Sequence, residues 1–343
     1  MRKKAKEQGT SACCHHQRKP WFKEPLYWVS LTIFLTLIVH WGSIFFIGKS
    51  FLQPLFEKFW QYLKLTWWAI GLGFLIGGLI NIFVPEELMI KLLGKRKRSI
   101  LTAVLLGFLA SACSHGILAI AVSLFKKGAS TAATLAFLLA APWANLAITI
   151  LLLAFFGWNA LFIIGGALLI AILAGLIFQL LEKKGIIESN KKEFLNPKKV
   201  ESWHWPGWFN LSKDLLSSSW SLAKMILWWI FLGLFLASIL GSYIPEAFFH
   251  RFFGPSFWGM LSTLAFASII EICSEGSAPM AFELWQKTGA FGNVFVFLMA
   301  GVATDFTEIG IVFTNIGKKA ALALILVTIP LVLLLGFLFN NLL

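Results

Sequence analysis

Long apolar stretches dominate this 343-residue sequence and limit the folds it can adopt. They recur nine times, at 26–47, 66–84, 100–125, 131–156, 160–181, 221–244, 257–284, 291–313 and 319–340. A membrane-spanning helix needs about 20 apolar residues, and nine such stretches are too many for the buried helices of one globular core. Only 13% of the residues are charged, against about 25% in soluble domains. The sequence therefore predicts an all-α polytopic membrane protein.

The net charge is +13, and the basic residues that produce it are distributed as is typical of membrane loops. Lysine and arginine occur in short runs between apolar stretches, at 95–98, 126–127 and 183–184. Such runs mark cytoplasmic loops, so we expect the lipid bilayer, and no nucleic acid, as the partner of these charges. The first apolar stretch follows a basic leader of about 25 residues and has no small-residue cleavage site, so we expect it to stay as a membrane span.

The two halves of the chain align with each other at an offset of 160 residues. Pro85-Glu86 falls on Pro245-Glu246, and Cys113-Ser114-His115-Gly116 falls on Cys273-Ser274-Glu275-Gly276, within 19 identities over 86 ungapped pairs. Chance similarity between apolar sequences explains matched leucines, but not these motifs in one register. We predict a basic cytoplasmic tail at 1–25, an extra transmembrane helix at 26–49, two repeats at 50–181 and 210–343, and a cytoplasmic linker at 182–209.

The distribution of basic residues predicts that the two repeats are inverted. If every apolar stretch crosses once, lysine and arginine are divided almost evenly between the two sides. If one stretch per half is a re-entrant hairpin, 23 lie inside and 5 outside, with a cytoplasmic N-terminus. The positive-inside rule favours the second topology, and inverted repeats with broken helices recur in transporters.

Two stretches in each half are candidates for the hairpin: 100–125 with 257–284, or 131–156 with 291–313. We favour the first pair, because Gly116 and Gly276 lie among small polar residues where a helix would break. Pro142 would loosen the fourth stretch, either as a simple kink or as part of a gate. Stretches 50–65 and 210–224 resemble amphipathic helices lying on the membrane surface.

Ionisable groups at membrane depth are expensive, and they indicate function by default. The second half holds four of them, Glu271, Glu275, Asp305 and Glu308, whereas their counterparts in the first half are Ser111, His115, Asn145 and Ile148. A site between the halves would attract a cation or exchange protons. The alternative is that these acids pair with Lys224 or satisfy backbone groups freed by the breaks.

Cys113 and Cys273 occupy equivalent repeat positions, so a pseudo-twofold axis could bring them together. His115 and Glu275, two residues further on, would complete a set of two sulfur, one nitrogen and one oxygen donors, which suits a soft or borderline ion. The alternative is that the cysteines only pack. In the N-terminal tail, a second candidate metal-capturing group consists of Cys13, Cys14, His15 and His16.

The chain resembles a known family at these motifs. Cys113-Ser114-x-Gly116, Lys127-Gly128-Ala129-Ser130 and the run from Ala136 to Asn145 resemble the bacterial ArsP/YraQ family of predicted permeases, from about residue 60 to 340. The resemblance implies an inner-membrane permease that exports trivalent organoarsenicals or metal ions. It also implies that Cys113 and Cys273 are thiol ligands. His115 stands where many members have a second cysteine, and this departure favours a divalent metal ion over three-thiolate arsenic coordination.

We therefore expect a secondary exporter of a thiophilic metal or metalloid, with a binding site built from Cys113, Ser114, His115, Cys273, Ser274, Glu275, Asn145 and Asp305. The chain has no Walker-type phosphate-binding sequence, so we expect that it does not drive itself with ATP. We also expect no cofactor and no enzymatic activity. Two alternatives remain open at this point: a permease for an unrelated organic solute, and a membrane thiol oxidoreductase.

Overall fold

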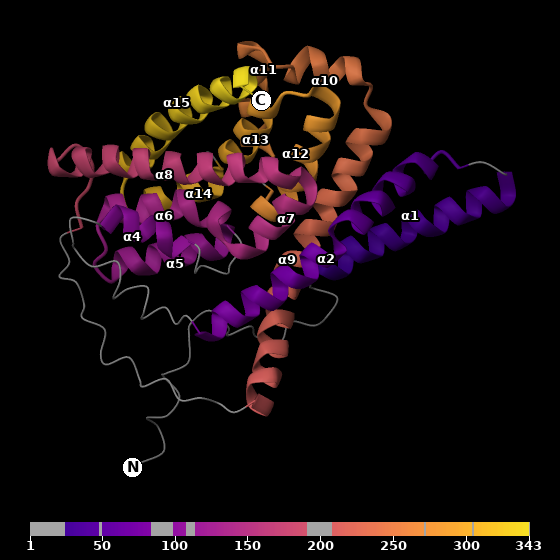
Figure 1. Cartoon of the computed structure of the whole chain (residues 1–343), viewed down its shortest axis with the longest axis horizontal. Coiled ribbons are helices and arrows are strands. Elements are labelled where there is room, and N and C mark those ends of the chain that lie inside the picture. Colours follow the sequence, from indigo (N-terminus) through magenta and orange to yellow (C-terminus); the bar gives the residue numbers. More distant parts are fainter. Residues whose placement is uncertain are drawn as a thin grey trace.

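The computed structural model describes residues 25–47, 50–83, 99–107, 114–190, 208–270, 272–303 and 305–342. Within these ranges the chain is helical and contains no β-strand, as the sequence predicts (Figure 1). The first half comprises α1 (Pro25–Ile47), α2 (Gln53–Phe83), α4 (Ser99–Leu106), α5 (Ser114–Lys126), α6 (Thr131–Ala144), α7 (Leu146–Phe156), the short 3-10 helix η3 (Gly157–Asn159) and α8 (Ala160–Lys183). The second half comprises α9 (Trp208–Tyr243), α10 (Glu246–Phe253), α11 (Phe257–Ile269), α12 (Ser274–Thr288), α13 (Phe291–Ala303), α14 (Phe306–Asn315) and α15 (Lys318–Leu342).

The helices of the two halves correspond at the offset of 160 residues. Shifted by 160, the starts of α5, α6 and α7 fall on the starts of α12, α13 and α14, and the end of α2 falls on the end of α9. This correspondence follows from the duplicated sequence, because equivalent Gly, Pro and polar positions end equivalent helices.

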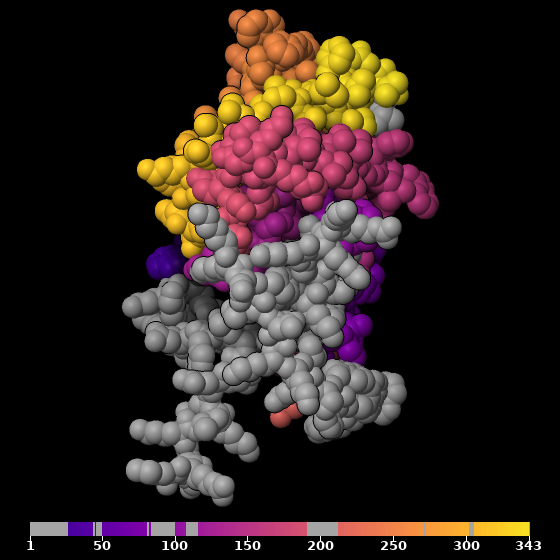
Figure 2. Space-filling model, turned by 90° about the vertical axis from the view of Figure 1, so that its left-hand side faces the viewer, coloured from indigo at the N-terminus to yellow at the C-terminus, as the bar shows by residue number. Residues whose placement is uncertain are grey.

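Equivalent helices run antiparallel where they meet. The Tyr243 hydroxyl at the end of α9 donates a hydrogen bond to the Phe51 carbonyl just before α2, at 2.8 Å, whereas Gly78 near the end of α2 lies against Ser219 near the start of α9. In the same way Phe162, at the start of α8, contacts Phe339, at the end of α15. Figure 2 shows α8 and α15 side by side on one face. Repeats whose equivalent helices are antiparallel are inverted, as predicted.

Four described segments are long and apolar enough to cross a membrane, or six if two bent helix pairs each count as one span. In the second half both candidate hairpin stretches are interrupted, one between α11 and α12 and the other between α13 and α14. In the first half the break between α6 and α7 is described, whereas residues 108–113, between α4 and α5, lie outside the described residues. Which of them folds back stays a prediction. The expectation of surface helices at 50–65 and 210–224 is wrong, because these residues continue without a break into α2 and α9.

The α2–α9 pair lies against one side of the helical core. Helix α2 packs on α7, α9 packs on α12, and α7 and α12 contact each other. Their shared core includes Leu151, Phe155, Ile230 and Ile272. A second core cluster fills the space between α4, α5, α6 and α8. The paired helices α2 and α9 thus cover the start of α12, where the Cys-Ser-x-Gly motif of the second repeat lies.

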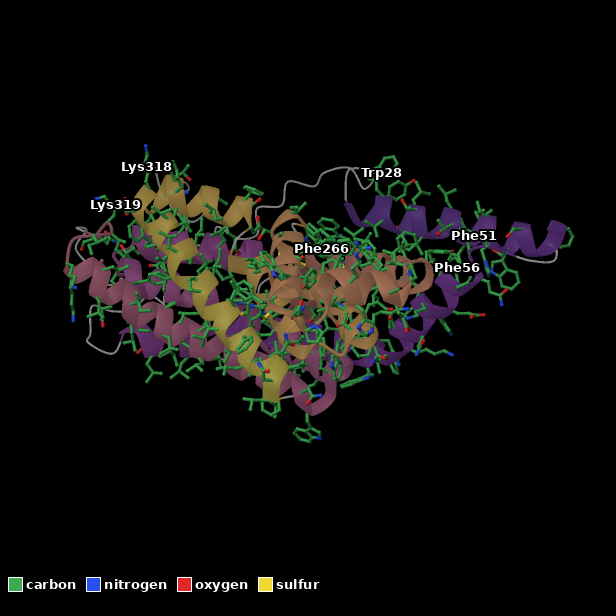
Figure 3. The ribbon with its side chains drawn as sticks, turned by 90° about the horizontal axis from the view of Figure 1, so that it is seen from above. Trp28, Phe51, Phe56, Phe266, Lys318 and Lys319 are labelled. Carbon is green, nitrogen blue, oxygen red and sulfur yellow. The ribbon has the colours of Figure 1, made fainter. Side chains whose placement is uncertain are left out.

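The last turn of α8 and the segment after it cap the ends of three other helices. The Glu182 carboxylate accepts the first N–H groups of α6. Asn190 donates to the Phe125 carbonyl in the last turn of α5 and to the Ala129 carbonyl just after it. Glu188 accepts the N–H groups of Lys319 and Ala320 at 3.0 and 2.8 Å, in the first turn of α15. Lys318 and Lys319 lie at the end of the molecule opposite Phe51 and Phe56 (Figure 3).

The capping bonds of Glu188 also affect its ionisation. Partial burial raises the pKa of this carboxyl, but the backbone N–H groups and the Lys319 charge outweigh burial, so its pKa lies below the ordinary value. The ionised form of Glu188 therefore stabilises the start of α15.

Candidate functional site

The candidate site lies at the break between α11 and α12. Helix α11 ends at Ile269, and α12 begins at Ser274 with Cys273 as its N-cap residue, in an extended conformation at φ −61° and ψ 161°. Gly276 in the first turn lies against the Trp229 carbonyl of α9, where a Cβ atom would stand only 2.8 Å from that oxygen. Small residues therefore allow the start of α12 to approach α9 closely.

Glu275 in this first turn is an almost completely buried acid, with 2% of its surface exposed. Its Oε2 accepts a hydrogen bond from the Ser274 hydroxyl at 2.9 Å, and the Cys273 side chain interacts with the same carboxyl. No described residue donates a hydrogen bond to Oε1. A buried polar atom without a partner is costly, and in membrane proteins such groups mark ion or substrate sites.

Glu275 lines a small cavity of about 10 Å³. The other lining residues are apolar or glycine and come from α2, α7 and α9: Ala69, Ile70, Gly73, Phe74, Ala147, Leu151, Ile226 and Ile230. A cavity needs about 10–15 Å³ to hold one water. In this conformation the site therefore admits one water or a bare ion at most, and a larger cargo requires α12 to move away from α2 and α9.

Asn145 and Asp305, which are repeat equivalents, cap helices at the other pair of breaks. The Asn145 Oδ1 accepts the N–H of Ile148 at 2.9 Å at the start of α7, and the Asp305 Oδ1 accepts the N–H of Thr307 at 2.7 Å at the start of α14. Both capping residues are buried. The Asn145 amide also donates to the Pro142 carbonyl at 3.4 Å, so these side chains satisfy backbone groups at the breaks.

Glu308, in the first turn of α14, is another buried acid, with 3% of its surface exposed. None of the described acids forms the ion pair with Lys224 that the sequence suggested. The Lys224 ammonium lies over the Trp220 ring instead, 5.8 Å from its centroid.

Several predicted residues or side chains lie outside the described part of the chain: Cys13, Cys14, His15, His16, Cys113, Glu271, and the side chains of Ser114 and His115. The predicted meeting of Cys113 with Cys273 therefore stays a prediction.

Among the described residues, no group of three or more His, Cys, Asp or Glu side chains could hold a metal ion. Cys273 and Glu275 alone supply one sulfur and one carboxylate donor at the start of α12. A four-coordinate ion would need further ligands, and His115 and Cys113 at the equivalent positions of the first repeat are the candidates.

A buried ion pair that the sequence analysis missed lies further along α12. The Lys58 ammonium of α2 donates to both carboxylate oxygens of Glu283, at 2.9 and 3.1 Å, and the Tyr62 hydroxyl donates to Oε2. Glu283 is 0% exposed, whereas the Lys58 side chain is 30% exposed. The signal for this acid was its position eight residues after Glu275 in the same apolar stretch. Its partner could not be recognised, because Lys58 lies 225 residues away.

A second groove lies between α1 and α2, with a volume of about 880 Å³. Its lining is mostly apolar and includes Phe34, Trp41 and Trp60. His40 also lines it, and a hydrogen bond of 2.9 Å joins the His40 Nδ1 and the Ser50 hydroxyl. This groove lies between the extra helix α1 and the first helix of the first repeat.

The model of the ArsP_1 family, described as predicted permeases, matches residues 54–341. The chain belongs to this family. It is a multi-pass membrane permease, and the resemblance noted in the motifs is confirmed. The match contains both repeats, the site at Cys273 and Glu275, and the Lys58–Glu283 pair, whereas α1 lies before it.

Curated relatives of this permease carry related names. A candidate permease of Mycobacterium tuberculosis is 27% identical over 246 residues, which are 63% of this chain and 59% of that protein, so the chain spans less than two thirds of this relative. The UPF0718 protein YcgR of Bacillus subtilis is 25% identical over 77% of this chain and 89% of its own length. A candidate subunit of a two-component membrane permease complex of Streptococcus mutans is 25% identical over 70% of this chain and 79% of its own length. No solved structure matches.

Proposed function

We propose that this permease is a secondary exporter of a thiophilic metal or metalloid species, such as a trivalent arsenical or a soft divalent metal ion. The observation that carries the proposal is the start of α12, where the buried Cys273 thiol lies in the same turn as the Glu275 Oε1, which accepts no hydrogen bond from the described residues. We place the protein in the bacterial inner membrane with a cytoplasmic N-terminus, as the distribution of basic residues favours.

The donor types support this class of cargo. A cysteine thiolate binds soft and borderline ions, and a carboxylate adds an oxygen donor and a negative charge. We assign Ser274 to orient the Glu275 carboxylate, because its hydroxyl donates to Oε2. Cys113 and His115, with Ser114, are the proposed contribution of the first repeat.

We assign proton coupling to acids in the apolar stretches of the second repeat, with the buried Glu275 as the first candidate. Its Oε1 accepts no hydrogen bond from the described residues, so this oxygen is available to bind a proton when the cargo is absent. Glu271, Asp305 and Glu308 are the further candidates. Collapse of the proton gradient across membrane vesicles should stop transport; unchanged transport would remove proton coupling from the proposal.

The experiment that tests the function is a sensitivity panel in a bacterium that lacks its own exporters. Cells that produce the wild type, C113S/C273S or E275Q would be exposed to arsenite, methylarsenite, zinc, cadmium, copper and mercury. We expect the wild type to raise the tolerated concentration of one or more of these species by at least tenfold, and both variants to lose this protection at equal protein level in the membrane.

The matched control is E246Q. Glu246 is an exposed acid at the start of α10 that lies 3.7 Å from Lys287 of α12, and its substitution should leave the protection unchanged. Protection by C113S/C273S equal to that of the wild type would contradict a thiol-based site and favour an organic solute as cargo. A disulfide between these cysteines, trapped after mild oxidation and required for activity, would favour thiol oxidoreduction.

A further inference from the structure

Lys58, Tyr62 and Glu283, which we call the α2–α12 cluster, join two helices that also enclose the Glu275 cavity. The cluster contains the one ion pair that the described part of the chain forms between α2 and α12. Glu283 is also confined by α9, because a Cβ atom on Gly241 would overlap its carboxylate. The carboxylate therefore lies in a space closed by α2 on one side and by a glycine of α9 on the other.

The cluster and the cavity lie at two different points along α12, and residues of α2 contribute to both. Glu283 follows Glu275 by eight residues, or about 12 Å along α12. On α2 the order is reversed, since Lys58 and Tyr62 contact Glu283 whereas Ala69 and Gly73 line the cavity beside Glu275. The two helices are thus antiparallel, with the ion pair beside the partly exposed Lys58 and the cavity further toward the start of α12.

The burial of Glu283 gives this ion pair its strength. A carboxylate with 0% exposure needs a counter-charge. If Lys58 is removed, Glu283 stays buried without one, and this strongly destabilises the conformation in which Glu283 is buried. Movement of α12 away from α2 would separate Glu283 from both of its partners. The arrangement that closes the cavity is therefore the arrangement that satisfies Glu283.

We propose that the α2–α12 cluster acts as a lock that keeps the start of α12 closed over Cys273 and Glu275, and that the Lys58–Glu283 pair must separate when cargo enters or leaves. This inference rests on the proposed function, because it takes Cys273 and Glu275 as the transport site. It does not depend on which cargo binds there. Lys58, Tyr62 and Glu283 are positioning residues, because they act on the site through α12.

The test measures how fast N-ethylmaleimide alkylates Cys273 in membranes. The full-length protein would carry C13S, C14S and C113S, so that Cys273 is the remaining thiol. Cys273 is 1% exposed, and its alkylation requires the start of α12 to open. We expect K58M and E283Q each to raise the alkylation rate at least tenfold and Y62F to raise it less, whereas the charge-swapped K58E/E283K should return toward the wild-type rate.

Two controls separate opening of α12 from other effects. E246Q removes the exposed ion pair between Glu246 and Lys287 of the same helix, and should leave the rate unchanged. To detect general unfolding, A171C in a background that also carries C273S places a thiol at a fully buried position of the second core cluster. Its alkylation should stay slow in K58M and E283Q.

Two results would overturn the proposal. One is a Cys273 alkylation rate in K58M and E283Q that stays within twofold of the wild type and of E246Q. The other is a rise at A171C equal to the rise at Cys273, which would show that the cluster stabilises the whole fold rather than the closed site. Neither measurement uses a cargo, so the lock and the assignment of a thiophilic cargo can fail independently.

Discussion

Gly233 of α9 and Gly276 of α12 contact each other through their backbones. A methyl group on Gly233 would overlap the carbonyl oxygen of Gly276. This contact brings α9 against the first turn of α12, beside Cys273 and Glu275. The close approach explains why the buried acid lies in a cavity no larger than one water.

The first prediction concerns this contact. Because the added methyl has no space, G233A should lower the free energy of unfolding by about 1–3 kcal/mol, as overpacking in a close-packed core does. Thermal unfolding of the detergent-solubilised protein measures the effect. G71A is the matched control, since no atom lies within 4 Å of a Cβ atom at Gly71 and alanine favours a helix by up to about 1 kcal/mol. Equal unfolding temperatures of G233A and wild type would contradict the contact.

The second prediction concerns the cap of α14. Asparagine can accept the Thr307 N–H as Asp305 does, so D305N should keep the wild-type stability, whereas D305A should lose about 1 kcal/mol. Thermal unfolding at equal pH compares the two variants. A loss in D305N as large as that in D305A would show that the Asp305 charge, rather than its capping bond, stabilises the protein.

The third prediction concerns pH and Glu188. Because the pKa of Glu188 is lowered in the folded protein, its stabilising effect is complete above the ordinary pKa of a glutamate and is lost as pH falls through the lowered value. At neutral pH, E188Q should therefore be less stable by about 0.3–1 kcal/mol, the range for an anion at a helix start. Unfolding midpoints measured across acidic pH should converge with those of the wild type.

The control for Glu188 is E57Q. The Glu57 carboxylate accepts a hydrogen bond from the Gln53 side chain, in an exposed part of α2, and we expect little change in stability on its substitution. A difference between wild type and E188Q that does not shrink in acid would contradict the capping role.

Much of the architecture was predictable because the duplication is visible in the sequence. Pro245 and Cys273 have counterparts at the same offset, and in the structure helices restart directly after both residues. The break expected at Gly276 lies just before it instead, because Gly276 is already in the first turn of α12. The inversion was predictable from the loop charges, and the antiparallel contacts of α2 with α9 and of α8 with α15 agree with it.

The asymmetric features were not predictable from the repeat. Lys58 and Tyr62 correspond to Ser218 and Leu222, so the alignment gives no signal for a bond to Glu283. The polar residues at 50–65 indicated a surface helix, but Tyr62 is 3% exposed because it reaches a carboxylate of α12. The contacts of Lys58 and Tyr62 with Glu283 become visible only in the structure, where α2 and α9 pack against α7 and α12.

For the capping residues the sequence left two readings open. Asn145 and Asp305 were expected in the binding site, with bonding to backbone groups at the breaks as the alternative, and the structure shows the second, since both side chains accept N–H groups at helix starts. A role in transport for either residue stays a prediction.

The most direct test of the central claim is uptake of radiolabelled cargo, chosen from the sensitivity panel, into everted membrane vesicles. The account predicts that wild type and E246Q accumulate the cargo, whereas C273S and E275Q, present at the same level in the membrane, do not. Accumulation by C273S and E275Q at the wild-type rate would contradict a transport site at the start of α12.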